Sequence, residues 1–81
     1  MNDKQKVLSI MLTDTKRWWH PTDFMKNNEN FVGYSASARM SELKKLLPGL
    51  FVESYDKKFR TLKINNTYLE ENKKEIEIFL K

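Results

Sequence analysis

The stretch that decides the fold runs from Ser35 to Leu47 with the sequence SASARMSELKKLL, and Pro48 and Gly49 follow it directly. Its apolar residues recur at spacings of four, three and four, which places them on one stripe of a helix with 3.6 residues per turn. These residues are Ala36, Met40, Leu43 and Leu47. The spacing predicts a helix over residues 35–47 that begins with Ser35 as the N-cap and turns this stripe toward a core.

The opposite side of this helix is small, hydroxylated and basic. At about 100° per residue it carries Ala38, Ser41 and Lys45, with Ser37, Lys44 and Glu42 beside them. Short side chains let a helix approach another surface closely, and the two lysines add positive charge, a combination suited to a nucleic-acid groove. The same residues could also form an ordinary solvated face, so the rest of the chain has to decide between the two interpretations.

Length and composition exclude several classes of function. A chain of 81 residues has the size of one domain with one core, and it leaves no length for a buried catalytic cleft. It contains no cysteine and one histidine, His20, so we expect neither an enzyme nor a metal or other cofactor. The first apolar run, residues 7–12, is too short to span a membrane and lacks a leader cleavage site. We therefore expect a cytoplasmic protein without a membrane partner.

The positive charge is concentrated in the body of the chain. The net charge is +4; residues 1–65 contain twelve Lys and Arg against seven Asp and Glu, whereas residues 66–81 contain three against four. This distribution fits a nucleic-acid partner for the first part. We therefore divide the chain into a domain of residues 1–65 and a C-terminal amphipathic segment of residues 66–81.

The N-terminal third is expected to contain a helix, a short strand and a second, short helix. Asn2 and Gln5 form a capping pair that predicts a helix from Asp3 to about Thr13. Residues 16–20, KRWWH, have strand character, and on a strand one of the two tryptophans, Trp18 or Trp19, should point to the core and the other outward. The exposed one either covers the sheet edge or offers a stacking platform for bases.

The second helix is expected to begin at His20 and Pro21 and to end near Asn27. Proline is tolerated at a first helical position, and Asp23 in the first turn complements the helix dipole. We assign His20 a capping or surface role. An apolar turn around Gly33 should then lead to the long helix.

Two alternating runs, residues 50–55 and 59–64, predict a β-hairpin with Asp56, Lys57 and Lys58 between them. Pairing Tyr55 with Phe59 places four aliphatic side chains on one face, namely Leu50, Val52, Leu62 and Ile64. The other face then carries Phe51, Glu53, Tyr55, Phe59, Thr61 and Lys63. The cations at the tip, Lys57, Lys58 and Arg60, either contact phosphates or protect the hairpin edge from pairing with other chains.

The last helix is expected from Tyr68 to Leu80, with one apolar stripe and Ile78 on the opposite side. Apolar residues on both sides suggest a homodimer. The candidate dimer interface consists of Leu69, Ile76, Ile78, Phe79 and Leu80.

The order of these elements resembles the winged helix-turn-helix family, in particular its small members in bacteria and their phages. The resemblance covers residues 3–64 and rests on the stretches 18–24 and 33–43 and on the basic-tipped hairpin. It implies an α+β winged helix, made of a helix, a short strand, a helix, a recognition helix and a two-stranded wing, with an added C-terminal helix.

The resemblance also implies a function. The recognition helix would enter the major groove of double-stranded DNA with Ser35, Ser37, Ala38, Arg39, Ser41, Lys44 and Lys45, and the wing would contact DNA with Lys57, Lys58 and Arg60. Arg39 would touch phosphate, or Glu42 would hold it in an ion pair. The expected activity is transcription regulation by occupancy. The alternative is a protein-interaction module whose anchor is Trp18 or Trp19, Phe51, Tyr55 and Phe59.

Overall fold

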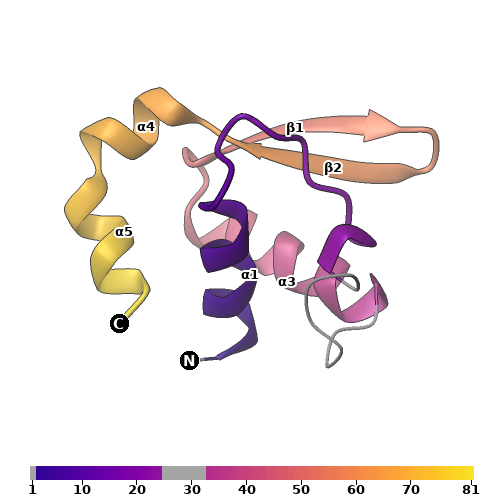
Figure 1. Cartoon of the computed structure of the whole chain (residues 1–81), viewed down its shortest axis with the longest axis horizontal. Helices are drawn as coiled ribbons and strands as arrows, with labels where there is room; N and C mark the ends of the chain where they lie inside the picture. The colour runs from indigo at the N-terminus through magenta and orange to yellow at the C-terminus, as the bar shows by residue number, and fades with distance from the viewer. Residues whose placement is uncertain (1, 25–32) are drawn as a thin grey trace.

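The computed structural model describes residues 2–24 and 33–81, and side chains are described except at residues 33–35. The described part has four helices, α1 (Asp3–Met11), α3 (Gly33–Leu46), α4 (Asn66–Glu71) and α5 (Lys73–Phe79). Its two strands, β1 (Phe51–Asp56) and β2 (Phe59–Ile64), form one antiparallel sheet (Figure 1). The predicted α+β class is therefore confirmed. The end of the predicted second helix and the residues before Gly33 in the apolar turn lie outside the described residues.

Helix α1 begins as predicted and ends earlier. The side chain of Asn2 accepts from the backbone N–H of Gln5 at 2.9 Å, and Gln5 returns the bond to the backbone N–H of Asn2 at 2.8 Å. This reciprocal pair satisfies two amides that a helix start leaves without partners. The helix ends at Met11 instead of Thr13, because the Thr13 hydroxyl donates to the carbonyl of Ile10 at 2.6 Å and competes with the helix pattern.

The predicted strand around the two tryptophans is reduced to a single β-bridge between Trp19 and Leu62. The Trp19 amide donates to the Leu62 carbonyl at 2.7 Å, and the Leu62 amide returns the bond at 3.0 Å. The bridge cannot lengthen past Pro21, which has no amide hydrogen to donate. Trp19 is buried and Trp18 is 42% exposed, so the predicted division between the two rings is confirmed.

Helix α3 presents its predicted apolar stripe to the core and packs against α1. The stripe residues Ala36, Met40, Leu43 and Leu47 are all buried. The bounds differ from the prediction: the helix begins at Gly33, so Ser35 lies in its first turn and is not the N-cap, and it ends at Leu46. We expected Gly33 to lie in a turn before the helix. Glycine is costly inside a helix but is well tolerated at its start, so the helix can begin at Gly33.

The hairpin register differs from the prediction by one residue. Asp56 pairs with Phe59 across a loop of two residues, so that Tyr55 faces Arg60 and Glu53 faces Leu62. Because side chains alternate between the faces of a strand, the slip turns every β1 side chain over while β2 keeps its predicted orientation. Phe51 and Glu53 therefore share the inner face with Leu62 and Ile64, and Val52 lies on the outer face with Phe59, Thr61 and Lys63.

Two features explain this register. Lys57, the first loop residue, has a positive φ of 59°, the left-handed backbone that two-residue hairpin loops require and that glycine or asparagine usually supplies. Leu50 is buried without belonging to the strand, since its amide bonds to the carbonyl of Leu47 at 3.0 Å in the turn after α3. The next inward position on β1 therefore falls to Phe51, which is larger than Val52 and is buried.

The predicted C-terminal helix is interrupted at Asn72, where φ is −129° and ψ is 32°. The Asn72 side-chain amide donates to the carbonyl of Tyr68 at 3.0 Å, a contact that competes with regular helix geometry. The break lets α4 continue from the sheet while α5 turns back beside α1 (Figure 1). There the Gln5 side chain donates to the Phe79 carbonyl at 2.9 Å. Residues 66–81 thus pack on the same core as the rest of the chain.

None of the helices in the described residues has the length and apolar character that a membrane span needs.

Gly49 sits against the ring of Tyr68 so closely that a β-carbon at position 49 would overlap it. Gly49→Ala should therefore lower the free energy of unfolding by about 1–3 kcal/mol, because the ring and the turn after α3 have to move apart. Urea unfolding followed by circular dichroism measures this change.

The matched control is the same substitution in a Tyr68→Ala background, where the ring is gone. The φ of Gly49 is not positive, so alanine fits its backbone, and there it should be neutral or stabilise by up to about 1 kcal/mol. An equal loss in both backgrounds would contradict the proposed overlap.

Candidate nucleic-acid interface

The face of α3 and the hairpin meet in a cluster of four polar side chains. Arg60 on β2 donates through Nη2 to the hydroxyl of Ser41 on α3. Lys44 on α3 donates to Oε2 of Glu53 on β1 at 2.5 Å, and Arg60 Nη1 lies 3.7 Å from the same oxygen. The structure therefore brings together three residues that the sequence assigned to the DNA interface, Ser41, Lys44 and Arg60. The fourth, Glu53, was assigned to the other face of the hairpin.

Glu53 is the electrostatic centre of this cluster. The hydrogen bond from the Lys44 ammonium holds the pKa of the Glu53 carboxyl below its ordinary value of 4.5; partial desolvation opposes this, and the charges of Lys44 and Arg60 reinforce it. Glu53 is thus ionised at neutral pH and neutralises part of the charge of two cations. The sequence held a signal for its inward position, because placing the larger Phe51 inward also places Glu53 inward.

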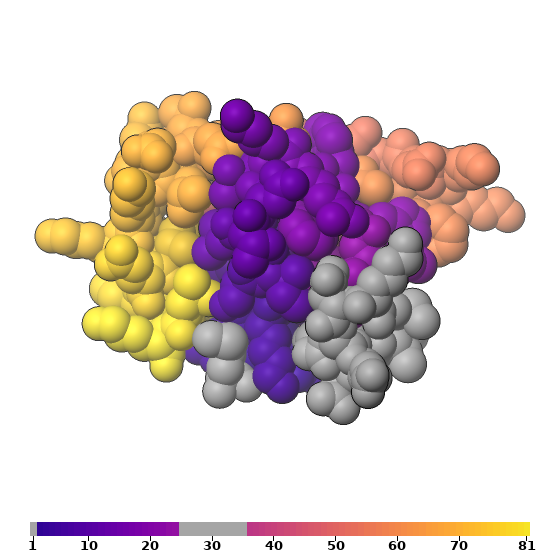
Figure 2. All heavy atoms as spheres, in the orientation of Figure 1, coloured from indigo at the N-terminus to yellow at the C-terminus, as the bar shows by residue number. Residues whose placement is uncertain are grey.

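Three further predicted cations are exposed and form no ion pair with any described residue. Lys45 lies on the open side of α3, and Lys57 and Lys58 form the hairpin loop. The space-filling view shows the hairpin end projecting beyond the body of the molecule (Figure 2). A projecting loop with two lysines can approach a phosphate backbone without steric conflict from the body.

The other flank of α3 is tied to α1. Arg39 donates to Glu42 at 2.7 Å, and Lys4 of α1 lies 3.7 Å from the same carboxylate. Of the two roles left open for Arg39, the structure shows the ion pair with Glu42. The Nε atom of Arg39 is buried without a hydrogen-bond partner. Of the remaining residues assigned to α3, Ser37 and Ala38 are partly exposed, and the side chain of Ser35 is outside the described set.

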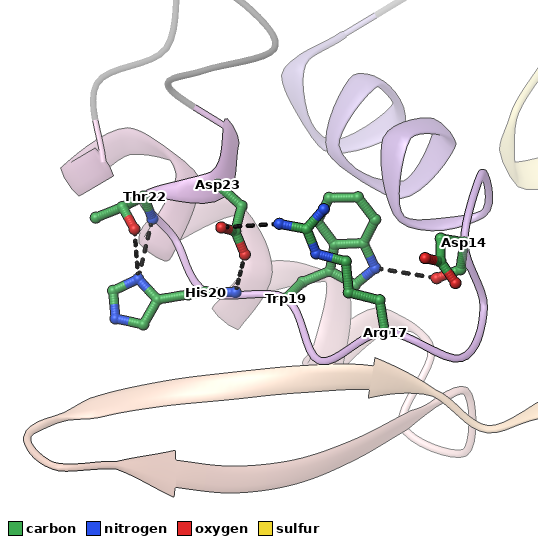
Figure 3. A network of polar contacts seen from close by, with 6 residues as sticks. All are labelled: Asp14, Arg17, Trp19, His20, Thr22 and Asp23. Atoms are coloured by element: carbon green, nitrogen blue, oxygen red, sulfur yellow. Dashed lines mark hydrogen bonds and ion pairs between the residues drawn. The ribbon is translucent and has the colours of Figure 1, made fainter.

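A polar network around His20 fixes the segment that leads to the sheet (Figure 3). The His20 ring nitrogen Nδ1 accepts from the Thr22 amide at 3.2 Å, and Asp23 accepts from the His20 amide at 2.8 Å. Asp23 also pairs with Arg17 at 3.0 Å, and that guanidinium lies 4.4 Å from the centroid of the buried Trp19 ring. The His20 side chain thus accepts a backbone amide two residues further along, as a cap does, in line with the capping or surface role expected for it, and the network holds Trp19 at its bridge.

Three apolar side chains are exposed on the outer face of the sheet, and we call them together the outer patch: Trp18, Val52 and Phe59. Their exposed fractions are 42%, 40% and 54%. The ammonium of Lys63 lies 5.5 Å from the Trp18 ring centroid, and the His20 ring lies 4.7 Å from that of Phe59.

Of the residues predicted as a protein-binding anchor, some are buried and some are exposed. Trp19 and Phe51 are buried in the core and cannot serve, whereas Trp18, Tyr55 and Phe59 are exposed. Tyr55 lies on the inner face of the hairpin with Arg60, so it does not belong to the outer patch.

The residues predicted to form a dimer interface are largely used within the chain. Ile76 is buried, and Leu69, Phe79 and Leu80 are partly buried against the core. Ile78 alone among the five is fully open, with 67% of its surface exposed. One isoleucine is too small an apolar area for a stable dimer.

Comparisons with known proteins found no match: no protein-family model matches the chain, and no curated protein and no solved structure matches it significantly. Among the described residues no group of three or more His, Asp or Glu side chains is placed to hold a metal ion.

The lowered pKa of Glu53 predicts how its contribution to stability depends on pH. A folded-state pKa below the unfolded value means that the contribution is fully present above about pH 4.5 and is lost as the pH falls through the folded value. The difference in unfolding free energy between the wild type and Glu53→Gln should therefore stay constant from about pH 7 to 5.5 and shrink toward pH 3. Urea unfolding at several pH values measures it. A difference that stays constant down to pH 3 would show that the Lys44 contact does not lower this pKa.

Proposed function

We propose that this chain binds double-stranded DNA as a winged helix-turn-helix protein and regulates transcription by occupying its site. In this arrangement α3 is the recognition helix in the major groove, and the β1–β2 hairpin is the wing that contacts the backbone. The Trp19–Leu62 bridge takes the place of the short third strand of such a sheet.

The observation that carries the proposal is the contact of Arg60 with Ser41 and of Lys44 with Glu53. These contacts join the hairpin to one flank of α3, so that the helix face and the hairpin loop belong to one continuous surface. The other flank is joined to α1 through Glu42. Between the two flanks the open side of the helix carries Ala38 and Lys45, and Ser41 lies at its border with the hairpin flank. The three positions lie within about 60° of one another.

The dimensions and chemistry of this surface fit a groove. Helix α3 has 14 residues, which corresponds to about 20 Å of helix at 1.5 Å per residue. A major groove about 12 Å wide admits one such helix, and small side chains at Ala38 and Ser41 allow close approach. The open side carries no Asn, Gln or Arg, the residue types that discriminate bases most sharply. We therefore expect affinity from phosphate contacts and only a modest sequence preference.

Binding to a random 20-bp duplex, measured by fluorescence anisotropy across salt concentrations, tests the proposal. Contacts with about four to six phosphates should give a log–log slope of about −4 to −5. Replacing Lys57 and Lys58 with alanine should reduce the size of the slope by about 2, because each lysine accounts for about one phosphate contact.

The matched control is the double variant Lys73→Ala and Lys74→Ala, which removes the same charge from exposed positions on α5. It should leave the slope nearly unchanged. No detectable binding at low salt, or an equal effect of the two double variants, would refute DNA binding through the wing.

A second function is favoured by the outer patch. Trp18, Val52 and Phe59 lie on the face of the sheet that points away from α3, so a protein partner could bind there independently of DNA. The same titration tests whether DNA binding depends on the outer patch. Trp18→Ser should leave duplex affinity unchanged if α3 and the wing bind DNA, whereas a loss of duplex binding would place the nucleic acid on the outer patch.

The packing of α5 favours binding as a single chain. Because most of the proposed dimer residues are used internally, sedimentation should give the monomer mass for the wild type and for Ile78→Glu alike at micromolar concentration. A dimer in the wild type that Ile78→Glu dissociates would restore the predicted interface.

A further inference from the structure

The cluster at the junction of α3 and the hairpin is built from the groups that proteins use to hold phosphate. It combines the hydroxyl of Ser41, the ammonium of Lys44 and the guanidinium of Arg60. Ammonium and guanidinium groups form charge-assisted hydrogen bonds to phosphate oxygens, and a serine hydroxyl adds a neutral one. Here Lys44 and Arg60 both contact the carboxylate of Glu53, and the Ser41 hydroxyl accepts a hydrogen bond from Arg60.

The positions of the donors follow from the fold. Ser41 and Lys44 are three residues apart on α3 and therefore lie on neighbouring positions of one side. Arg60 is the second residue of β2, and Glu53 is on β1 two positions further from the loop on the same face. Three donors from a helix and a strand therefore converge at the rim of the surface assigned to DNA, where a backbone phosphate would lie.

The cluster is accessible to an incoming anion. The side chains of Lys44, Glu53 and Arg60 are 38%, 24% and 26% exposed. Ion pairs with this much exposure contribute little to folding, so their loss does not require the chain to unfold. The Glu53 side chain is itself in contact with solvent, so it can turn away from the two cations without moving the strand.

Resting on the proposed function, we propose that Ser41, Lys44 and Arg60 form a site for a phosphate of the nucleic-acid backbone, and that Glu53 fills this site in the free protein until a phosphate displaces it. Glu53 is then an internal competitor that weakens non-specific binding. A glutamate carboxyl of ordinary pKa is already ionised at neutral pH, and the Lys44 contact lowers the pKa of Glu53 further, so the competition operates throughout the neutral range.

Duplex binding by the wild type, Glu53→Gln and Glu70→Gln tests the site. Both substitutions remove one negative charge, and Glu70 pairs with Lys73 at 3.7 Å near the C-terminal end of the chain, away from α3. Glu53→Gln should bind about eightfold more tightly at about 0.1 M salt, with a slope steeper by about 0.9, because Glu53 still occupies the site in most wild-type complexes with a random duplex and the variant gains this one phosphate contact. Glu70→Gln should change the affinity less than about twofold.

A second variant separates the loss of competition from a change in folding. Glu53→Ala should tighten binding like Glu53→Gln, and circular dichroism should show that both remain folded at the assay temperature. Lys44→Ala introduced into Glu53→Gln should cancel most of the gain, because the freed ammonium is what binds the added phosphate. A gain that persists without Lys44 would overturn the site.

Inorganic pyrophosphate is a probe that does not depend on duplex recognition. In an NMR titration it should shift the signals of Ser41, Lys44 and Arg60 at lower concentration in Glu53→Gln than in the wild type. Equal shifts in both proteins would overturn the role of Glu53.

The outcomes distinguish this inference from the proposed function. If the wild type binds the duplex and Glu53→Gln matches Glu70→Gln, the phosphate site is wrong and DNA binding stands. If neither the wild type nor Glu53→Gln binds the duplex at low salt, the proposed function fails, and the assignment of the cluster to a nucleic-acid phosphate fails with it.

Discussion

The register of the β-hairpin is the constraint on which the rest of the surface depends. Pairing Asp56 with Phe59 leaves only Lys57 and Lys58 in the loop and fixes which side of β1 faces α3. A shift by one residue would bury Val52 in place of Phe51 and turn Glu53 to the outer face. Lys44 would then have no carboxylate on the hairpin to contact. The two-residue loop therefore determines both which β1 side chain is buried in the core and which charged side chains lie at the candidate interface.

The same register creates the second surface of the molecule. With Phe51 inward, Val52 lies outward beside Lys63, and Phe59 and Trp18 share that face. The hairpin thus has a polar, charged inner rim near its loop and an apolar outer side. The two surfaces therefore face opposite sides of one thin sheet.

The ion pairs on the two flanks of α3 have different partners but the same arrangement. Glu53 contacts Lys44 and Arg60 on the hairpin side, and Glu42 contacts Arg39 and Lys4 on the α1 side. Each carboxylate holds one close and one more distant cation. The helix is therefore fixed on both sides by partly exposed charges, while its apolar stripe is buried beneath. Most of the basic charge near α3 is already paired, and Lys45 and the loop lysines supply the rest.

The sequence by itself determined the features that depend on local periodicity and on short-range hydrogen bonds. The stripe from Ala36 to Leu47 and the capping pair of Asn2 and Gln5 follow from spacings of three and four residues, and both are present. Tertiary structure decided the features that depend on competition for one core. Leu50 and Phe51 are both buried in the core, and this shifts the hairpin register by one residue. The C-terminal helix, which periodicity alone would continue, is broken at Asn72, because α5 turns back onto α1. The position of Glu53 beside Lys44 also depends on this packing. Alternation along a strand gives two possible faces, and only packing against the rest of the chain selects between them.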